Sequence, residues 1–447
     1  MSILIYNGCI ITLDSSNTVI NNGAVLIEND KIVEIGQSDE MYKKHNKSAK
    51  ILDAKSRVVM PGFICGHMHF YSAFATGIPL PPFPKGFVEV LKGLWWKIDL
   101  GLLKEDVYYS ALLGYIQAIK SGTTTIIDHH ASPNFIKGSL DEIEKAGRKT
   151  GVRSVLCYEV TNRNNGEKEE SEGLEENERF IKKCQDKKDD MMGGLVGLHA
   201  CFTVTDNALK KAEEIVKNYN SGIHIHVAEG EYDMEYSKEH YGLTVVQRLE
   251  KFNLLTPRSI LAHCVHIEDV DYQILKGKLP IIVTQPRSNM NNAVGTLNIW
   301  KLEEQGIPYG MGTDGMSADM KDELNVGILL HKHVRKNNIV ATMELYNSLM
   351  KQNPRIVKQL LGVNVGSIEK NFKADLIITN YYPKTPVNSD NTVGHIVFGV
   401  LNEAIASTII NGKICMEEGV LTDIDEQKVT EKTRELAQKV WNRVNNN

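Results

Sequence analysis

Short apolar segments alternate with amphipathic helical segments through the middle of the chain, and this alternation constrains the fold most. Apolar segments of strand length that are separated by helices indicate buried parallel strands, each connected to the next by a helix. Eight such segments occur, at 57–65, 123–128, 153–160, 194–200, 222–229, 259–266, 280–286 and 309–315. Eight strand–helix units predict a (β/α)8 barrel of the α/β class. Between two of them, residues 108–122 have helical spacing and end at Gly122, which favours a helix terminus.

The two ends of the chain have a different character. Residues 1–57 consist of short β-type segments separated by Asn, Gly and Asp, and residues 367–447 contain similar segments. We therefore predict a composite β-sandwich made from both ends, around a barrel at 58–366. The amphipathic stretch at 426–444 predicts a helix that docks on the body or on a neighbouring chain. Its apolar face consists of Val429, Leu436, Val440 and Trp441.

Composition narrows the function classes. The formal net charge of -5, with scattered basic residues, argues against a nucleic-acid or membrane-surface partner. No apolar run reaches the length of about 18 residues that a membrane span needs, and the N-terminus lacks the pattern of a signal peptide. The 7 cysteines are widely spread and form no CxxC pair, which is typical of reduced thiols. We expect a cytoplasmic protein that binds a small molecule.

Two connections stand out by composition. Residues 71–101 are rich in Pro and contain Trp95 and Trp96. This segment either covers a flat substrate or packs on the barrel rim or at a subunit contact. Residues 161–177 are polar and mostly charged, and we expect them to form a solvated loop.

Five polar residues fall at the ends of predicted strands that are far apart in sequence. They are His67, His69, His226, His263 and Asp314. A parallel barrel has its active site at the carboxyl ends of its strands. Three imidazoles and a carboxylate are the usual ligands of a catalytic zinc ion, although iron or manganese suits the same donors. The pattern predicts a metal-activated water and therefore a hydrolase.

The number of metal ions follows from the fourth predicted strand. A second ion would often use a carbamylated lysine from that strand, and 194–200 contains no lysine. We therefore infer a single divalent metal.

The HxH pair at His67 and His69 places both imidazoles on one side of a strand, because side chains alternate with period 2. By itself this pattern is weak, since the chain has 14 histidines and also contains His224 with His226. We expect His224 to point the same way as His226 but one layer deeper, in a structural role.

Other polar residues near strand ends have two interpretations each. Glu229 either shuttles protons beside the metal or caps the next helix. Asp314 either binds the metal or forms an Asx-turn before Gly315. His199 either contacts the substrate or is a histidine at the barrel rim whose hydrogen bonds are made within the protein. Asn289 either hydrogen-bonds the substrate or hydrogen-bonds the backbone of its own loop. His129 and His130 are weaker candidates, expected behind the ligands.

Six segments, taken in order, resemble the motifs of the amidohydrolase superfamily over nearly the whole chain. They are PGFICGHMHF, GTTTIIDHH, HIHVAEGE, LAHCVHIED, QPRSNMNNAVG and MGTDGMS. The chain looks most like the branch of aminohydrolases and chlorohydrolases that act on N-heterocycles, which includes guanine and S-adenosylhomocysteine deaminases and triazine hydrolases. Within that branch, WWKIDL and SNMNNAVG are similar to the SsnA group of aminohydrolases.

The resemblance implies a role for each candidate. His67, His69, His226 and Asp314 would bind the metal. Glu229 would protonate a ring nitrogen of the substrate. His263 would polarise the attacking water instead of binding the metal. His199 would contact the substrate, and Trp95, with Trp96 and Phe83, would cover its ring.

The expected activity is metal-dependent hydrolytic deamination of an aminated N-heterocycle such as a purine, pterin or triazine. A cyclic amidase or chlorohydrolase of the same superfamily is the alternative, and a non-catalytic scaffold is a third possibility. Membership of this superfamily would indicate the class of reaction better than it would indicate the substrate. The resemblance also suggests a homo-oligomer, a dimer or larger.

Overall fold

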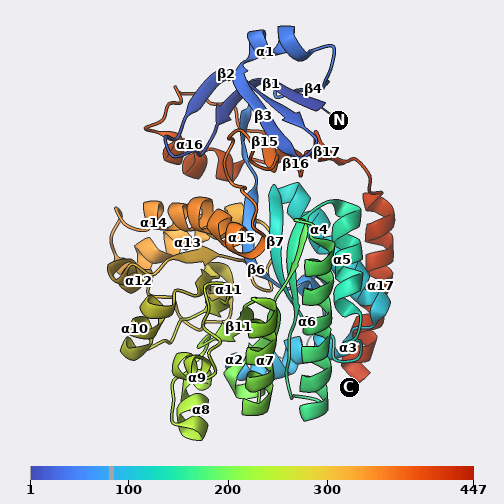
Figure 1. Ribbon diagram of the computed structural model, residues 1–447, viewed down its shortest axis with the longest axis vertical. Coiled ribbons are helices and arrows are strands. Elements are labelled where there is room, and N and C mark those ends of the chain that lie inside the picture. Colours follow the sequence, from blue (N-terminus) through green and yellow to red (C-terminus); the bar gives the residue numbers. More distant parts are fainter. Residues whose placement is uncertain (1, 80–84, 447) are drawn as a thin grey trace.

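Nine short strands form the centre of the α/β structure (Figure 1), which is a computed structural model that describes residues 2–79 and 85–446. Their bounds are β6 Phe63–Met68, β7 Thr123–His130, β8 Arg153–Tyr158, β9 Met192–Gly194, β10 Val196–Ala200, β11 Ile223–Val227, β12 Ile260–His263, β13 Ile281–Thr284 and β14 Tyr309–Met311. All pairings among them are parallel, in one sheet from β6 to β9 and another from β10 to β14.

Two isolated parallel bridges connect these sheets at both edges. Val160, after β8, pairs with Leu198 of β10, and Met68 of β6 pairs with Asp314, after β14. The strands therefore follow one another around a ring in chain order, which is the arrangement that a barrel requires.

The fourth predicted strand is divided into β9 and β10 around Leu195, because each part pairs with a different neighbour. A Cβ atom at Gly197 would lie 2.2 Å from the carbonyl oxygen of Tyr158. Only glycine permits this close approach of β10 to β8, so the split lies where the two sheets meet.

Helices cover the outside of the strands (Figure 1). The main ones are α4 Lys104–Ser121, α5 Ser139–Thr150, α6 Glu167–Lys187, α7 Asp206–Tyr219, α8 Glu231–Tyr241, α9 Val245–Lys251, α10 Asp269–Lys278, α11 Pro286–Asn291, α12 Ile299–Gln305, α13 Met320–Arg335, α14 Thr342–Asn347 and α15 Asn353–Leu361. The helix predicted at 108–122 is confirmed as α4. It ends at Gly122, whose φ of 79° is left-handed.

The prediction of a solvated loop at 161–177 is wrong for most of its length, because α6 begins at Glu167. Two of its glutamates are buried and cap neighbouring elements. Glu170 accepts hydrogen bonds from the backbone N–H and the hydroxyl of Thr205, both at 2.7 Å. Glu176 accepts the N–H of Leu140, in the first turn of α5, at 3.2 Å. Carboxylates at helix N-termini stabilise those ends.

Strands from both chain ends share one nine-stranded sheet, in the order β18-β17-β16-β15-β5-β1-β2-β3, with β4 beside β1. Their bounds are β1 Ser2–Ile11, β2 Val19–Glu28, β3 Lys31–Gln37, β4 Lys50–Asp53, β5 Val58–Pro61, β15 Leu376–Thr379, β16 Ile405–Ile410, β17 Lys413–Glu417 and β18 Val420–Leu421, with helices α1 Ser38–His45 and α16 Thr392–Phe398 beside them. The two ends meet where β15 pairs antiparallel with β5. The description of this sheet as a sandwich stays a prediction.

The last helix, α17 Glu426–Asn446, packs along α3 Trp96–Gly101 and α4, on the flank of the central strands (Figure 1). Leu436 and Val440, on the predicted apolar face, are buried. Trp441 donates a hydrogen bond from Nε1 to the carbonyl of Phe74 at 2.7 Å. None of the helices that the structure describes is long and apolar enough to cross a membrane, and the seven cysteines are free thiols.

A buried ion pair links the central strands to the sheet of the chain ends. Arg153, at the start of β8, is fully buried, and its Nε lies 3.2 Å from Oδ2 of Asp375, just before β15. The other carboxylate oxygen of Asp375 accepts the backbone N–H of Asn411 at 2.6 Å. Removing Asp375 would leave the buried charge of Arg153 with only the more exposed carboxylate of Asp190, 3.6 Å away, as a partner.

We expect Asp375→Ala to lower the free energy of unfolding by about 3 kcal/mol, because the buried guanidinium of Arg153 would lose its closest carboxylate and keep only that of Asp190, 3.6 Å from Nη1. The measurement is the midpoint of urea denaturation. Lys413→Ala is the control, since it removes an exposed pair with Asp423 and should change stability by less than about 0.5 kcal/mol. Equal midpoints for the two variants would contradict the structural role given to Asp375.

Candidate metal centre and active site

Four of the predicted residues come together at the carboxyl ends of the strands. His67 and His69 close β6, His226 lies near the end of β11, and Asp314 follows β14. Their ligand atoms all lie within 4.8 Å of one another. Nε2 of His69 is 3.2 Å from Nε2 of His226 and 2.9 Å from Oδ1 of Asp314. This group of side chains, called the ligand cluster below, could hold a metal ion.

The backbone brings the first and last strands of the ring together at this point. The N–H groups of Thr313 and Asp314 both donate to the carbonyl of His67, at 2.8 and 3.0 Å. A Cβ atom at Gly312 would lie 2.5 Å from the backbone nitrogen of His67. Glycine at 312 therefore permits the close approach that places the Asp314 carboxylate beside the histidines.

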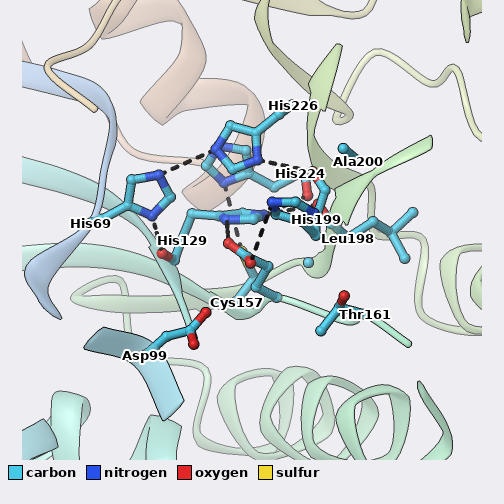
Figure 2. A network of polar contacts seen from close by, with 12 residues as sticks. His69, Asp99, His129, Cys157, Thr161, Leu198, His199, Ala200, His224 and His226 are labelled. Carbon is cyan, nitrogen blue, oxygen red and sulfur yellow. Dashed lines mark hydrogen bonds and ion pairs between the residues drawn. The ribbon is translucent and has the colours of Figure 1, made fainter. Parts of the chain in front are cut away.

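The imidazoles of the cluster are oriented by their Nδ1 atoms (Figure 2). His69 Nδ1 lies 2.5 Å from the carbonyl of His129, and His226 Nδ1 lies 2.9 Å from the carbonyl of His199. Because a carbonyl oxygen only accepts, these Nδ1 atoms carry the hydrogen and each Nε2 has a free lone pair. Carbonyl partners of this kind are typical of metal-binding histidines.

Two further observations fit a cation in the cluster. Nε2 of His67 is buried and has no hydrogen-bond partner among the described residues. The lone pairs on Nε2 of His69 and His226 face each other beside a carboxylate, an arrangement that is repulsive without a positive charge. Although burial opposes ionisation, the neighbouring imidazoles of His67 and His69 hold the pKa of the Asp314 carboxyl well below its usual value. The donor set therefore fits a divalent metal ion.

Glu229 and His263 form a second group that shares Asp314 with the ligand cluster. Nε2 of His263 is 3.4 Å from Oε2 of Glu229, and it has no hydrogen-bond partner among the described residues. Burial raises the pKa of the Glu229 carboxyl. A carboxylic acid with a raised pKa is suited to donate a proton near neutral pH.

Asn289, predicted to contact the substrate, is 1% exposed and lies behind His263. Its side-chain oxygen is 2.8 Å from Nδ1 of His263, so it positions that ring. The neighbouring Asn292 is in the pocket wall instead and donates a hydrogen bond to Glu229 at 3.2 Å. Sequence spacing alone did not separate these two asparagines, because Asn289 lies in α11 and Asn292 is the residue that ends this helix.

A pocket opens over the ligand cluster, and most other predicted residues line it. The described lining residues are His69, Tyr71, Phe87, Leu91, Trp95, Trp96, Glu159, Arg163, His199, Ala200, Phe202, His226, Glu229, Asp233, Asn292, Asp314 and Gly315. Nδ1 of His199 lies 2.7 Å from the hydroxyl of Thr203, which fixes its ring.

The connection after His69 forms short helices above this pocket: η1 Phe70–Ala75, α2 Phe87–Val90, η2 Leu91–Trp95 and α3. Phe87, Leu91, Trp95 and Trp96 line the pocket. Of the two roles open to the connection, covering the pocket is therefore the one that its side chains fit. Phe83 lies outside the described residues.

The sequence analysis missed Glu159, Arg163 and Asp99, which form a buried network beside the cluster. Oε2 of Glu159 is 3.1 Å from Nδ1 of His129, one of the residues expected behind the ligands. Glu159 follows β8 directly, so its place at a strand end was the available signal. Arg163 and Asp99 gave no such signal, because neither lies at the end of a strand. They belong to the connections 161–177 and 71–101.

The sequence model of the amidohydrolase family matches residues 58–415. The chain belongs to the amidohydrolase family. Relatives of this amidohydrolase include a 5'-deoxyadenosine deaminase from Methanosarcina barkeri, 31% identical over 99% of both chains. A 5-methylthioadenosine/S-adenosylhomocysteine deaminase from Carboxydothermus hydrogenoformans is 32% identical over 96% of both chains. The resemblance found in the sequence is thus confirmed.

A solved structure shows the same fold. The crystal structure of an adenosine deaminase from Xanthomonas campestris with bound zinc superposes with a TM-score of 0.85, at 18% sequence identity, and covers 98% of each chain. The two named relatives are deaminases that align with this chain over 96% or more of their length. The fold similarity to the solved structure includes the strands that carry the ligand cluster.

His224, expected to be structural, contacts a member of the ligand cluster. Its Nε2 is 2.8 Å from Nδ1 of His67, and its own Nδ1 is 3.6 Å from the thiol of Cys157. His67 alone among the three histidines of the cluster has a side chain, not a carbonyl, as its Nδ1 partner.

We expect His224→Leu to weaken zinc affinity by about 10–100-fold, because His67 would lose the acceptor that orients it. His224→Gln keeps an acceptor oxygen and is expected to retain most of the affinity. Competition with a chromogenic chelator measures both variants. Unchanged affinity in the folded His224→Leu protein would show that His224 does not position the ligand.

Proposed function

We propose that this amidohydrolase is a metal-dependent hydrolytic deaminase of an amino-substituted N-heterocycle, with an adenosine-like nucleoside as its preferred class. The observation that carries the proposal is the grouping of Glu229, His263 and Asp314 beside the three histidines of the ligand cluster. Of these two groups, His69, His226, Glu229 and Asp314 line one pocket. The names of the full-length relatives support the same reaction.

In this proposal His67, His69, His226 and Asp314 hold one divalent metal, with zinc favoured and iron or manganese suited to the same donors. When bound, such an ion makes a water molecule acidic enough to act as a nucleophile at neutral pH. The neighbouring chlorohydrolase and amidase reactions would use the same water, but the relatives' names favour deamination.

The side chains then divide the proton transfers. Glu229 donates its proton to the ring nitrogen next to the amino-bearing carbon, which makes that carbon electrophilic. His263, held by Asn289, accepts a hydrogen bond from the attacking water, and Asp314 accepts its proton. The proton on Asp314 then passes to the amino group, the carbon–nitrogen bond breaks and ammonia leaves. The ring keeps the oxygen as a carbonyl, and the remaining proton of that oxygen returns to Glu229. His199 contacts the substrate and Trp95 covers its ring.

The domain description is also a proposal. We infer a (β/α)8 barrel at 58–366 and a β-sandwich built from 1–57 and 367–447, and the strand order around the ring and the shared sheet support both. Similarity to the SsnA group, a cytoplasmic location and a homo-oligomeric state stay predictions. A scaffold role is disfavoured, since such a protein has no use for an intact set of metal-capable side chains.

The test is ammonia release by the zinc-loaded protein from adenosine derivatives, guanine, pterins and aminotriazines. We expect release from an adenosine derivative, and a loss of at least about 100-fold in kcat for Glu229→Gln, which removes the proton donor. Glu231→Gln makes the same change at an exposed position two residues away and should retain activity. Silence across the panel from protein that holds metal would reject the deaminase assignment.

A further inference from the structure

One arginine occupies the wall of the pocket next to Trp96. Nη2 of Arg163 lies 2.8 Å from Oδ2 of Asp99 and 3.0 Å from Oε1 of Glu159. The guanidinium packs over the ring of Trp96, 4.8 Å from its centre, and the side chain is only 5% exposed. We call Arg163, Asp99, Glu159 and Trp96 the Arg163 corner.

The Arg163 corner is adjacent to the ligand cluster, with the ring of His199 between them. The centre of the His199 ring is 5.7 Å from that of His226 and 6.0 Å from that of Trp96. A heterocycle held between Glu229 and His199 would therefore share one pocket with Arg163, Glu159 and Trp96 of this corner, which leaves them within reach of a ring substituent.

The charge of Arg163 is already balanced within the corner. Glu159 and Asp99 are both buried and both pair with its Nη2 atom. Among the described lining residues Arg163 is the only lysine or arginine, whereas the carboxylates are Glu159, Glu229, Asp233 and Asp314. Residues 80–84, outside the described part, read Leu-Pro-Pro-Phe-Pro and carry no charged side chain.

Hydrogen-bonding capacity nevertheless remains in the corner. Nη1 of Arg163 and Nε1 of Trp96 are buried donors without partners among the described residues, and Oδ1 of Asp99 is a buried acceptor without one. These atoms are covered in this structure, so a substituent reaches them only by displacing the side chains around them. A neutral polar substituent would then satisfy them without bringing a charge into the pocket. An anionic substituent would meet two carboxylates and no unpaired cation, and burying an unpaired charge is costly.

We infer that the pocket selects amino-heterocycles whose substituent is uncharged and polar, and rejects those that carry a carboxylate or phosphate, with Arg163 and Asp99 as the specificity-determining pair. This inference rests on the proposed function. It separates the substrates named for the relatives, since 5'-deoxyadenosine and methylthioadenosine are uncharged in their side chains, whereas S-adenosylhomocysteine carries an amino-acid carboxylate.

The test compares substrates of the same shape that differ by one charge. Adenosine 5'-carboxamide and adenosine 5'-carboxylate form one pair, and pterin-6-carboxamide and pterin-6-carboxylate form the second. With the zinc-loaded full chain, kcat/KM for the carboxamide should exceed that for the carboxylate by about 100-fold or more. Equal values, or a preference for the carboxylate, would overturn the inference.

Variants assign the discrimination to the corner. Asp99→Asn removes one of the two carboxylates that balance Arg163, so the carboxamide-to-carboxylate ratio should fall by about tenfold. Asp189→Asn is the matched control, because Asp189 pairs with Arg148 at a more exposed position, and it should leave the ratio unchanged. An unchanged ratio in folded Asp99→Asn protein would overturn the role of the pair.

The outcomes separate this inference from the proposed function. Turnover of both members of a pair at equal rates would reject the charge selection and leave the deaminase assignment intact. Turnover of neither member of either pair, by zinc-loaded protein that releases ammonia from another compound of the panel, would overturn this inference alone. Silence across the whole panel would reject the proposed function and this inference together. The wild-type ratio decides the charge selection even where a variant does not fold.

Discussion

The close approach of the first and last central strands is the constraint on which the site depends. Two successive N–H groups, of Thr313 and Asp314, donate to one carbonyl, that of His67. Glycine at 312 removes the side chain that would collide with His67. Without this junction the strands could not close into a ring, and Asp314 would not reach the histidines that come from β6 and β11.

Ring order also fixes the chemistry of the ligands. His69, on β6, is oriented by a carbonyl of the next strand in the ring, and His226, on β11, by a carbonyl at the end of β10. A histidine whose Nδ1 donates to the backbone cannot place its hydrogen on Nε2 in the neutral state. Pairing between neighbouring strands therefore sets which nitrogen of each imidazole is free to bind a cation.

The strands and the ligand set could be predicted from sequence because both are local patterns. Strands that are buried on both faces appear as continuous apolar runs, and each candidate ligand follows such a run. The start of α6 could not be predicted in this way. Its glutamates look like a solvated loop by composition, and only the fold brings Glu170 to Thr205 and Glu176 to α5. The break between β9 and β10 likewise depends on contact of Gly197 with Tyr158.

The Arg163 corner and the role of Asn289 were hidden for the same reason. Arg163 and Asp99 lie in separate connections, and their pairing exists only after both fold over the strand ends. Asn289 and Asn292 are the same residue type and are three positions apart. Only the structure shows that Asn289, in α11, lies behind His263, whereas Asn292, at the end of α11, lines the pocket. Polar residues at strand ends can be recognised in the sequence, and these form the ligand cluster. The pocket wall is formed by contacts between segments that connect different strands, and such contacts cannot be seen in the sequence.

The aromatic side chains over the pocket, Phe87, Trp95 and Trp96, are called the aromatic cover. They connect the protonation of Glu229 to the selection of substrates. Gly230 follows Glu229 and Gly315 follows Asp314, and neither has a side chain to hold the cover away. A Cβ atom would lie 2.8 Å from Cδ1 of Phe87 at position 230 and 3.0 Å from Cη2 of Trp95 at position 315. The aromatic rings therefore pack directly against the backbone that follows the two acidic residues. Glu229 is buried in this pocket, which favours its protonated form. The same burial acts on a bound substrate. A charged substituent enclosed under this cover could not be stabilised by solvent, so its pairing with protein groups decides whether it binds.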